Sequence, residues 1–223
     1  MARFLVTGAT RGIGRAVLDA LAGHELIALG RDEPALRQLP VSRWVLADLS
    51  RPTTLSDALP AFDRLDGVVH SAGVARRVRL ADAEPDEWLR QFTLNVFAVA
   101  ELTRLLLPAL RAGQGRVVVI NSRQGLNAAA NSCVYAASKY AARGLAQALA
   151  AEEPRLLVTT IYPGRVATDM QRELRRQEDA AWQPERYIQP GTVAAVVAQV
   201  LGTPPDAVVS DVVLHPGQHS SPA

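Results

Sequence analysis

Near the start of the chain stands Thr7-Gly8-Ala9-Thr10-Arg11-Gly12-Ile13-Gly14, directly after an apolar run at residues 4–6 and at the opening of a helical pattern. Glycines at such a junction permit a tight turn and let the backbone come close to a ligand. The start of the helix offers free N–H groups and the positive end of its dipole to a phosphate. The stretch therefore predicts a strand, a turn and a helix that together hold a diphosphate. Its spacing, Gly-x-x-x-Gly-x-Gly, differs from the common fingerprint Gly-x-Gly-x-x-Gly.

Outside this stretch, short apolar runs alternate with longer helical patterns. The predicted strands are residues 3–6, 26–29, 44–46, 67–70, 116–120, 157–161 and 208–214, and the predicted helices include 12–22, 54–58, 85–110, 134–151 and 192–201. Near-continuous apolar strands separated by helices indicate a parallel sheet covered on both faces, and right-handed crossovers favour a doubly wound arrangement. We therefore expect an α/β fold with a Rossmann-like, doubly wound parallel sheet of about seven strands, in a single domain over residues 1–223.

The composition excludes several classes of protein. Of 223 residues, 48% are hydrophobic and 21% are charged, which suits a domain with a substantial core. The net charge of +2 is too small to indicate nucleic-acid binding. The single cysteine, Cys133, excludes an intrachain disulfide and favours a reducing compartment. No apolar run approaches the ~18 residues of a membrane span, and the N-terminus has no secretory pattern. We expect a cytoplasmic protein without a metal site or a membrane partner.

A pair of residues four positions apart, Tyr135 and Lys139, faces one side of a predicted helix. A free tyrosine has a pKa of about 10, and a nearby ammonium favours the phenolate and lowers that pKa. The pair therefore has the chemistry of a proton donor for neutral pH. A surface tyrosine packed on a lysine stem is the alternative interpretation, and the rest of the chain decides between them.

Charge predicts which dinucleotide the glycine turn holds. The second strand should end about 20 residues past the glycines, where an acidic residue takes a ribose 2′-OH and an arginine takes a 2′-phosphate. This strand ends at Gly30, Arg31 follows it, and Arg11 in the turn can face the same place. Two guanidiniums suit a phosphate dianion, so NADP(H) is favoured over NAD(H). Asp32 argues for NAD(H), unless it begins the next turn or helix.

Together with further elements in order along nearly the whole chain, these residues resemble the short-chain dehydrogenase/reductase family, in its shorter dehydrogenase subgroup. The further elements are Asp48-Leu49, Ser71-Ala72-Gly73, Asn95, Ser122 thirteen positions before Tyr135, and Pro163-Gly164 followed by Val166 and Thr168. No single match is decisive, but their common register is specific.

The resemblance implies a catalytic set of Asn95, Ser122, Tyr135 and Lys139. Tyr135 would protonate a developing alkoxide while a hydride reaches the carbonyl carbon, and Ser122 would hydrogen-bond the carbonyl oxygen. Lys139 would lower the pKa of Tyr135 and hold the nicotinamide ribose. Asn95 would hold a backbone group or a water that links Lys139 to solvent. The alternative for Asn95 is a buried asparagine whose hydrogen bonds are satisfied by helix backbone. The alternative for Ser122 is a serine in a turn after a strand.

The resemblance also implies contacts with the cofactor. Asp48 would cap the adenine pocket, Pro163-Gly164 would approach the nicotinamide amide, and Thr168 would donate to that amide or to phosphate, or else cap a helix. Ser71 replaces the usual asparagine that tethers neighbouring strands. The whole predicted set is Gly8, Thr10, Arg11, Gly12, Ile13, Gly14, Arg31, Asp48, Leu49, Ser71, Ala72, Gly73, Tyr135, Lys139, Pro163, Gly164, Val166 and Thr168.

Three residues are predicted to face the substrate. Arg123 follows Ser122 and points either to solvent or to the substrate mouth, and Arg165 follows the Pro-Gly turn. Cys133 would form a small apolar wall or pack in the core. The two arginines favour a substrate with a carboxylate or another anion. Residues 170–189, polar and rich in Arg and Glu, form either a surface helix and loop or a lid over the site, and the lid is favoured because ligands bind outside the strand ends.

The favoured function is an NADP(H)-dependent carbonyl reductase or alcohol dehydrogenase for a small-molecule ketone or secondary alcohol. The alternative is a non-catalytic NADP-binding sensor or scaffold on the same fold, which loss of Tyr135 or Lys139 would have favoured. An epimerase or dehydratase does not suit the chain length and the glycine spacing. Relatives often pair through the two long helices, here residues 85–110 and 134–151, so a homodimer or homotetramer is expected.

Overall fold

The computed structural model describes residues 1–217 of the chain. Its centre is a seven-stranded sheet in which all neighbouring strands are parallel, in the order β3-β2-β1-β4-β5-β6-β7. The strands are β1 (Arg3–Thr7), β2 (Glu25–Gly30), β3 (Arg43–Leu46), β4 (Gly67–His70), β5 (Arg116–Ile120), β6 (Leu157–Pro163) and β7 (Asp211–Leu214). The predicted parallel sheet is confirmed, although the last strand starts at Asp211 rather than at residue 208.

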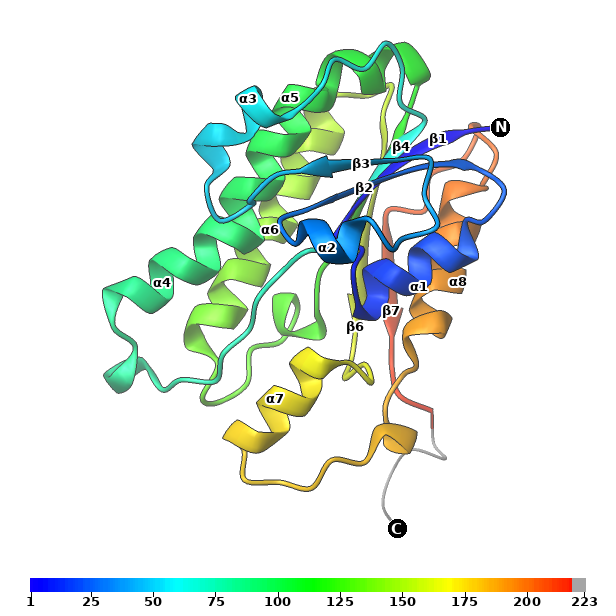
Figure 1. The fold of residues 1–223 in the computed structure, drawn as a ribbon. Coiled ribbons are helices and arrows are strands. Elements are labelled where there is room, and N and C mark those ends of the chain that lie inside the picture. Colours follow the sequence, from blue (N-terminus) through cyan, green and yellow to red (C-terminus); the bar gives the residue numbers. More distant parts are fainter. Residues whose placement is uncertain (218–223) are drawn as a thin grey trace.

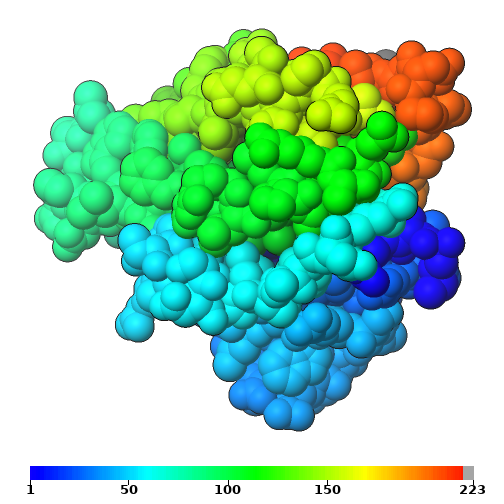
Figure 2. Space-filling view, turned by 90° about the horizontal axis from the view of Figure 1, so that it is seen from above, coloured from blue at the N-terminus to red at the C-terminus, as the bar shows by residue number. Residues whose placement is uncertain are grey.

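Helices cover both faces of the sheet (Figure 1). They are α1 (Gly12–Ala20), α2 (Glu33–Leu36), α3 (Leu55–Ala58), α4 (Pro85–Phe92), α5 (Ala98–Gly113), α6 (Cys133–Glu152), α7 (Asp169–Gln177) and α8 (Pro190–Leu201). Consecutive residues of β5 enter different core clusters, Val117 beneath α5 and α6 and Val118 beneath α1 and α8. This double burial explains why the strands have no polar alternation. Figure 2 shows α5 (green) between the chain around α3 (cyan) and α6 (yellow-green).

The order of the strands reverses beside β1, which pairs with β2 on one side and with β4 on the other. At such a switch point the connections leave the sheet toward opposite faces, and the crevice beyond the carboxyl ends of the strands receives ligands. The Thr7–Gly14 turn follows β1 and lies at this point. The fold therefore brings the glycine turn and the ends of β4, β5 and β6 to one edge of the sheet.

The predicted helix at residues 85–110 is longer and interrupted. A π-helical turn, η3 (Thr93–Phe97), joins α4 to α5, so that Pro85–Gly113 forms one helical segment. By length and composition alone this segment could cross a membrane, which corrects the expectation that no run is long enough, and it is the one helix of this kind within the described residues. Leu102, Leu106 and Leu110 of α5 are buried in the core cluster on that face of the sheet. The apolar side of α5 thus serves the core.

The polar stretch predicted as a lid or a surface helix forms an excursion from the end of β6. The excursion contains α7 and a short turn at Pro184–Arg186. Its ends are joined, because the Ala167 N–H donates to the Ile188 carbonyl at 2.8 Å and the Ile188 N–H donates to the Arg165 carbonyl at 3.0 Å. Residues 167–187 therefore leave the ligand-binding edge of the sheet and return to it.

Candidate active site

The glycine turn is so tight that side chains could not replace its glycines. Gly8 and Gly12 have φ values of +66° and +57°, a region that favours glycine. A Cβ on Gly14 would lie 2.3 Å from the Gly8 carbonyl oxygen, and a Cβ on Gly8 would lie 2.9 Å from the Ala72 backbone. Thr10 and the exposed Arg11 complete the turn, and no side chain caps the first N–H groups of α1. These free donors beside an open glycine turn fit a diphosphate.

A tether between neighbouring strand ends comes from Thr7, which the sequence did not reveal in that role. Its hydroxyl accepts the N–H groups of Ser71 and Ala72, each at 3.1 Å. The end of β1 is therefore fixed to the turn after β4 by a threonine. Ser71 lines the cavity described below, and the Thr7 tether is present with serine at this position.

The region beyond β2 and β3 holds the residues predicted for the adenosine end of the cofactor. Arg31 is exposed, and its Nη1 lies 3.7 Å from Asp48 Oδ1. Asp48 also accepts the N–H and the hydroxyl of Ser50, at 2.9 and 2.8 Å, and Leu49 is buried beside it. Asp48 therefore shapes its own turn and keeps the Arg31 guanidinium near the end of β2.

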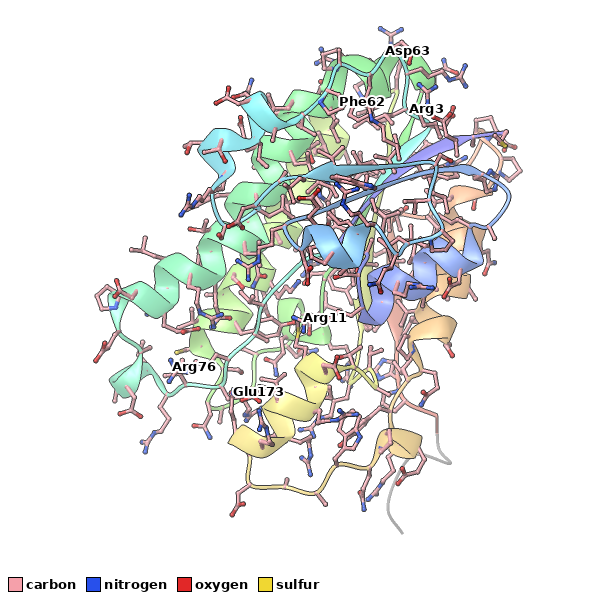
Figure 3. The ribbon with its side chains drawn as sticks, in the orientation of Figure 1. Arg3, Arg11, Phe62, Asp63, Arg76 and Glu173 are labelled. Atoms are coloured by element: carbon pink, nitrogen blue, oxygen red, sulfur yellow. The ribbon has the colours of Figure 1, made fainter. Side chains whose placement is uncertain are left out.

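Asp32, which argued for NAD(H), has a structural role. It is the N-cap of α2, a short helix missing from the sequence prediction, and its carboxylate accepts the Ala35 N–H at 3.1 Å. An aspartate at this position is a preferred cap. The charge that argued against a 2′-phosphate is thus engaged in starting a helix, and Figure 3 shows Arg11 near the start of α1.

Ser122, Tyr135 and Lys139 converge on one cavity of about 380 Å³ at the carboxyl edge of the sheet. The Ser122 side chain is near enough to the Tyr135 phenol to lower its pKa, and Ser122 Oγ accepts the Gln124 N–H at 3.1 Å. Lys139 Nζ lies 5.8 Å from the centroid of the Tyr135 ring and donates to the Ile120 carbonyl at 3.1 Å. A phenol, a hydroxyl and an ammonium therefore share one half-closed space.

The protonation of the pair differs from the expectation that Lys139 lowers the pKa of Tyr135. Burial raises the pKa of Tyr135 above its ordinary value, and the hydrogen bond from Ser122 opposes that rise. Burial also lowers the pKa of Lys139 to about 8. Desolvation disfavours both charged forms, so the structure keeps Tyr135 as a neutral phenol that can donate a proton.

Asn95 lies buried in the π-helical turn η3. Its Oδ1 accepts the Val74 N–H and its Nδ2 donates to the Val74 carbonyl, both at 2.9 Å. Nδ2 also donates to Ser138 Oγ at 2.9 Å, on the residue before Lys139. A Cβ on Gly73 would lie 3.1 Å from Asn95 Oδ1. The backbone group that Asn95 holds is thus Val74, in the loop after β4.

Sequence reasoning missed Asn121, the buried residue between β5 and Ser122. Its Oδ1 accepts the Ser122 N–H at 2.8 Å, and its Nδ2 donates to the Lys139 carbonyl at 3.0 Å. A Cβ on Gly125 would lie 2.5 Å from this Oδ1, so Gly125 makes room for the amide. A polar residue at the end of an apolar strand, directly before Ser122, was the available signal.

The turn after β6 supplies another wall of the cavity. Pro163, Gly164, Val166 and Thr168 all line it, together with Ile13 from the glycine turn. Thr168 is also the N-cap of α7, because its hydroxyl accepts the Gln171 N–H at 3.3 Å. The helix cap expected as the alternative role of Thr168 is therefore present. A Cβ on Gly12 would lie 3.3 Å from Thr168 Cγ2. The start of α7 therefore lies against the glycine turn.

The predicted substrate residues have different positions. Arg123 and Arg165 are exposed and line the cavity. Cys133 is not among the described residues that line it, and its thiol lies 3.6 Å from the Val78 carbonyl. Two positions along a helix correspond to a rotation of roughly 200°, so Cys133 points away from the side that carries Tyr135. The prediction of Cys133 as a pocket wall is therefore not supported.

The sequence and structure of this chain match known proteins along most of their length. A family model described as short chain dehydrogenase matches residues 2–179. YciK, an uncharacterized oxidoreductase of Escherichia coli, is 34% identical over 218 residues, which cover 89% of this chain and 85% of YciK. The L-fucose dehydrogenase of Bos taurus is 30% identical over 223 residues, covering 94% of this chain and 81% of that enzyme.

Solved structures agree with this grouping. A short-chain dehydrogenase of Shigella flexneri complexed with NADP has a TM-score of 0.84 and 31% identity, with 95% of each chain covered. The seven-stranded parallel sheet with helices on both faces is the fold class expected from the sequence. This chain belongs to the short-chain dehydrogenase/reductase family of oxidoreductases.

Proposed function

We propose that this oxidoreductase uses NADP(H) to reduce a ketone, or to oxidise a secondary alcohol, in the cavity beside Tyr135. The observation that carries the proposal is that Ser122, Tyr135 and Lys139 line one cavity, with the Lys139 ammonium 5.8 Å from the centroid of the Tyr135 ring. This arrangement aims two O–H groups at one place and keeps a cation beside the phenol. A carbonyl oxygen that gains negative charge needs these groups.

A nicotinamide cofactor held at this site would supply the hydride. Tyr135 donates its phenolic proton to the carbonyl oxygen as that oxygen becomes an alkoxide, and Ser122 hydrogen-bonds the same oxygen as its charge grows. Lys139 provides positive charge next to the phenolate that Tyr135 leaves and would hold the ribose hydroxyls of the cofactor. Asn95 fixes the loop after β4 through Val74. In alcohol oxidation the Tyr135 phenolate takes the proton back.

NADP(H) is favoured over NAD(H) by the charges at the end of β2. Arg31 and Arg11 would hold the 2′-phosphate, since guanidiniums suit a phosphate dianion. Gly30 offers no carboxylate to a ribose 2′-OH, and Asp32 is engaged as the cap of α2. The structural neighbours complexed with NADP or NADPH support the same choice.

We further propose that the stretch around residues 170–189 acts as a substrate lid on a single domain over residues 1–223. We also propose that the chain works in the cytoplasm as a homodimer or homotetramer. The lid is supported by Gln171 and Leu174 of α7, which line the cavity. Pairing through α4, α5 and α6 is supported by the exposed apolar side chains of Leu89 (61% exposed) and Phe97 (51% exposed). Light scattering on the eluted protein would measure the oligomer.

The test of the proposed function is turnover. Wild-type protein with NADPH should consume the reduced cofactor, followed by its ultraviolet absorbance, with at least one member of a panel of ketones, aldehydes and quinones. Tyr135→Phe should lose activity by about 10²–10⁴-fold while it still binds NADPH. If the wild type bound NADPH but turned over no member of the panel, the result would instead support a non-catalytic NADP-binding sensor or scaffold.

A further inference from the structure

The charges along the wall of the cavity are unequal. Of the charged residues in the described lining, five are cations (Arg76, Arg77, Arg123, Lys139 and Arg165) and one is a carboxylate (Glu178). Lys139 belongs to the catalytic set and Arg76 pairs with Glu87 at 3.4 Å, so Arg77, Arg123 and Arg165 remain. Positive charge gathered in a partly closed site attracts anions and raises their local concentration.

Glu178 is the meeting point of three guanidiniums. Its carboxylate is 13% exposed and lies 3.0 Å from Arg77 Nη1 and 3.0 Å from Arg165 Nη2, and it also pairs with Arg175. Three positive charges thus face one negative charge. Each guanidinium has five N–H donors, and Arg165 gives only one nitrogen to Glu178. The cluster therefore keeps a positive excess after its internal pairing.

The arginines of this cluster are held in place before any ligand arrives. Arg77 lies in the loop after β4. Its backbone N–H donates to Gln177 Oε1, at the end of α7, at 3.0 Å, and this bond fixes the loop to α7. Arg77 Nη2 also donates to the Ala130 carbonyl at 3.0 Å. Figure 3 shows the neighbouring Arg76 on the same loop, on the side of α7. A fixed side chain loses little entropy when it binds.

We propose that Arg77 and Arg165 recognise an anionic group, a carboxylate or a phosphate, on the substrate, and that Glu178 holds these two arginines in position. The inference rests on the proposed reduction at Tyr135, because it names the substrate class for that same cavity. The lining also includes Val74 and Leu174. These apolar walls suit an uncharged substrate body between the anion and the carbonyl group.

The first experiment compares para-acetylbenzoate with its methyl ester, which carry the same ketone. NADPH consumption is measured for the wild type, Arg77→Gln, Arg165→Gln and the double variant. Each substitution should raise KM for the acid about tenfold or more, since a hydrogen bond to a charged group is lost, and should leave kcat/KM for the ester unchanged. Arg111→Gln is the matched control, because Arg111 pairs with Glu153 at the other ends of α5 and α6.

A substitution of Glu178 tests its positioning role. Glu178→Gln removes the carboxylate that holds Arg77 and Arg165, so KM for the acid should rise severalfold while kcat/KM for the ester is unchanged. Equal effects on the acid and the ester in all these variants overturn the proposal, as does a wild type that prefers the ester. The ester also reports whether each variant folds.

Binding is measured apart from turnover. Benzoate and phenyl phosphate should raise the Tm of the NADPH-saturated wild type more than benzamide does, and this difference should vanish in the Arg77→Gln, Arg165→Gln variant. If the two anions raise the Tm more than benzamide does but no ketone is reduced, the proposed function fails and the anion site stands. Equal shifts with all three compounds overturn the anion site even if ketones are reduced, and the preference between the two anions separates carboxylate from phosphate.

Discussion

The side-chain amide of Asn121 donates a hydrogen bond of 3.0 Å to the main-chain carbonyl of Lys139. Because the same side chain accepts the Ser122 N–H at 2.8 Å, one buried residue joins the end of β5 to α6 at two catalytic positions. We predict that Asn121→Ala lowers kcat by about tenfold or more, because misplaced catalytic groups slow the reaction strongly. KM for NADPH should change little. Steady-state kinetics with a reducible ketone measure both.

Two further measurements separate positioning from simple loss of stability. Asn121→Asp keeps the acceptor for the Ser122 N–H but removes the donor to Lys139, so it should fall between the wild type and Asn121→Ala in kcat. Urea unfolding should show a loss of about 1–3 kcal/mol for the alanine variant, since buried partners are left unpaired. A variant that is destabilised while kcat stays at the wild-type value would contradict the positioning role.

Lys139 should set the alkaline limit of the reduction. Burial lowers its pKa to about 8, so its positive charge is present below that pH and is lost above it. The kcat/KM for ketone reduction should therefore fall as the pH rises through about 8, with the apparent value belonging to the Tyr135–Lys139 pair. Lys139→Arg, which stays charged, should lower the rate and move this limb to higher pH. A wild-type profile that stays flat through this range would contradict the assignment.

The charge of Lys139 has an opposite effect on stability. Its pKa in the folded protein lies below the ordinary 10.5 of lysine, so between these two values the unfolded chain binds the proton that the folded protein releases. The free energy of unfolding contributed by Lys139 should thus rise with pH from about 8 to 10.5. Activity and stability therefore respond in opposite directions over the same range.

The preference for NADPH should depend on Arg31 and Arg11. Arg31→Ala and Arg11→Ala should each weaken NADPH binding about tenfold, by loss of a charged hydrogen bond, and leave NADH binding unchanged. Asp32→Asn is the matched control, because asparagine also caps a helix and Asp32 is engaged with Ala35. Fluorescence titration of each reduced cofactor gives the ratio of the two Kd values. Equal weakening of NADPH and NADH binding would place the arginines outside the 2′-phosphate site.

Patterns local in sequence predicted much of the fold. Strands that are buried on both faces of the sheet appear in the sequence as continuous apolar runs, so the sheet could be predicted. The glycine turn after the first strand indicated where a ligand binds. The short helix α2 could not, since four residues carry no periodicity. The π-helical turn η3 was also hidden, because its hydrogen-bond pattern interrupts the helix without a proline or glycine. The helix α7 lies almost wholly within the polar stretch at residues 170–189, for which the sequence predicted either a surface helix and loop or a lid.

Parts of the site depend on contacts between distant residues and were therefore missed. Asn121 meets Lys139 across eighteen positions, and Arg77 meets Gln177 across a hundred. No pattern along the chain encodes such pairings. Burial also reversed the expected direction for the Tyr135 pKa, because the pair spacing shows that a cation is near but not how much water is excluded. The two-residue spacing between Cys133 and Tyr135 on one helix would have been enough to place Cys133 outside the cavity, because such residues point in nearly opposite directions.

His70 should make the fold sensitive to acid. It is buried at the end of β4, its Nε2 lies 2.9 Å from Thr103 Oγ1 on α5, and burial lowers its pKa to about 4. Its pKa in the folded protein lies below the ordinary 6.5, so the unfolded chain takes up a proton that the folded protein refuses. The free energy of unfolding should therefore fall, by about 3 kcal/mol in all, as the pH drops from 6.5 to about 4.

Substitution isolates the contribution of this histidine to acid sensitivity. His70→Gln keeps a polar group toward Thr103 and does not titrate, so its urea midpoint should change less with pH than that of the wild type across this range. His24→Gln, at an exposed position, serves as the matched control and should keep the wild-type acid sensitivity. If His70→Gln and the wild type lost the same free energy between neutral and acid pH, the proton taken up on unfolding would belong to another group, and the burial of His70 would have no effect on acid stability.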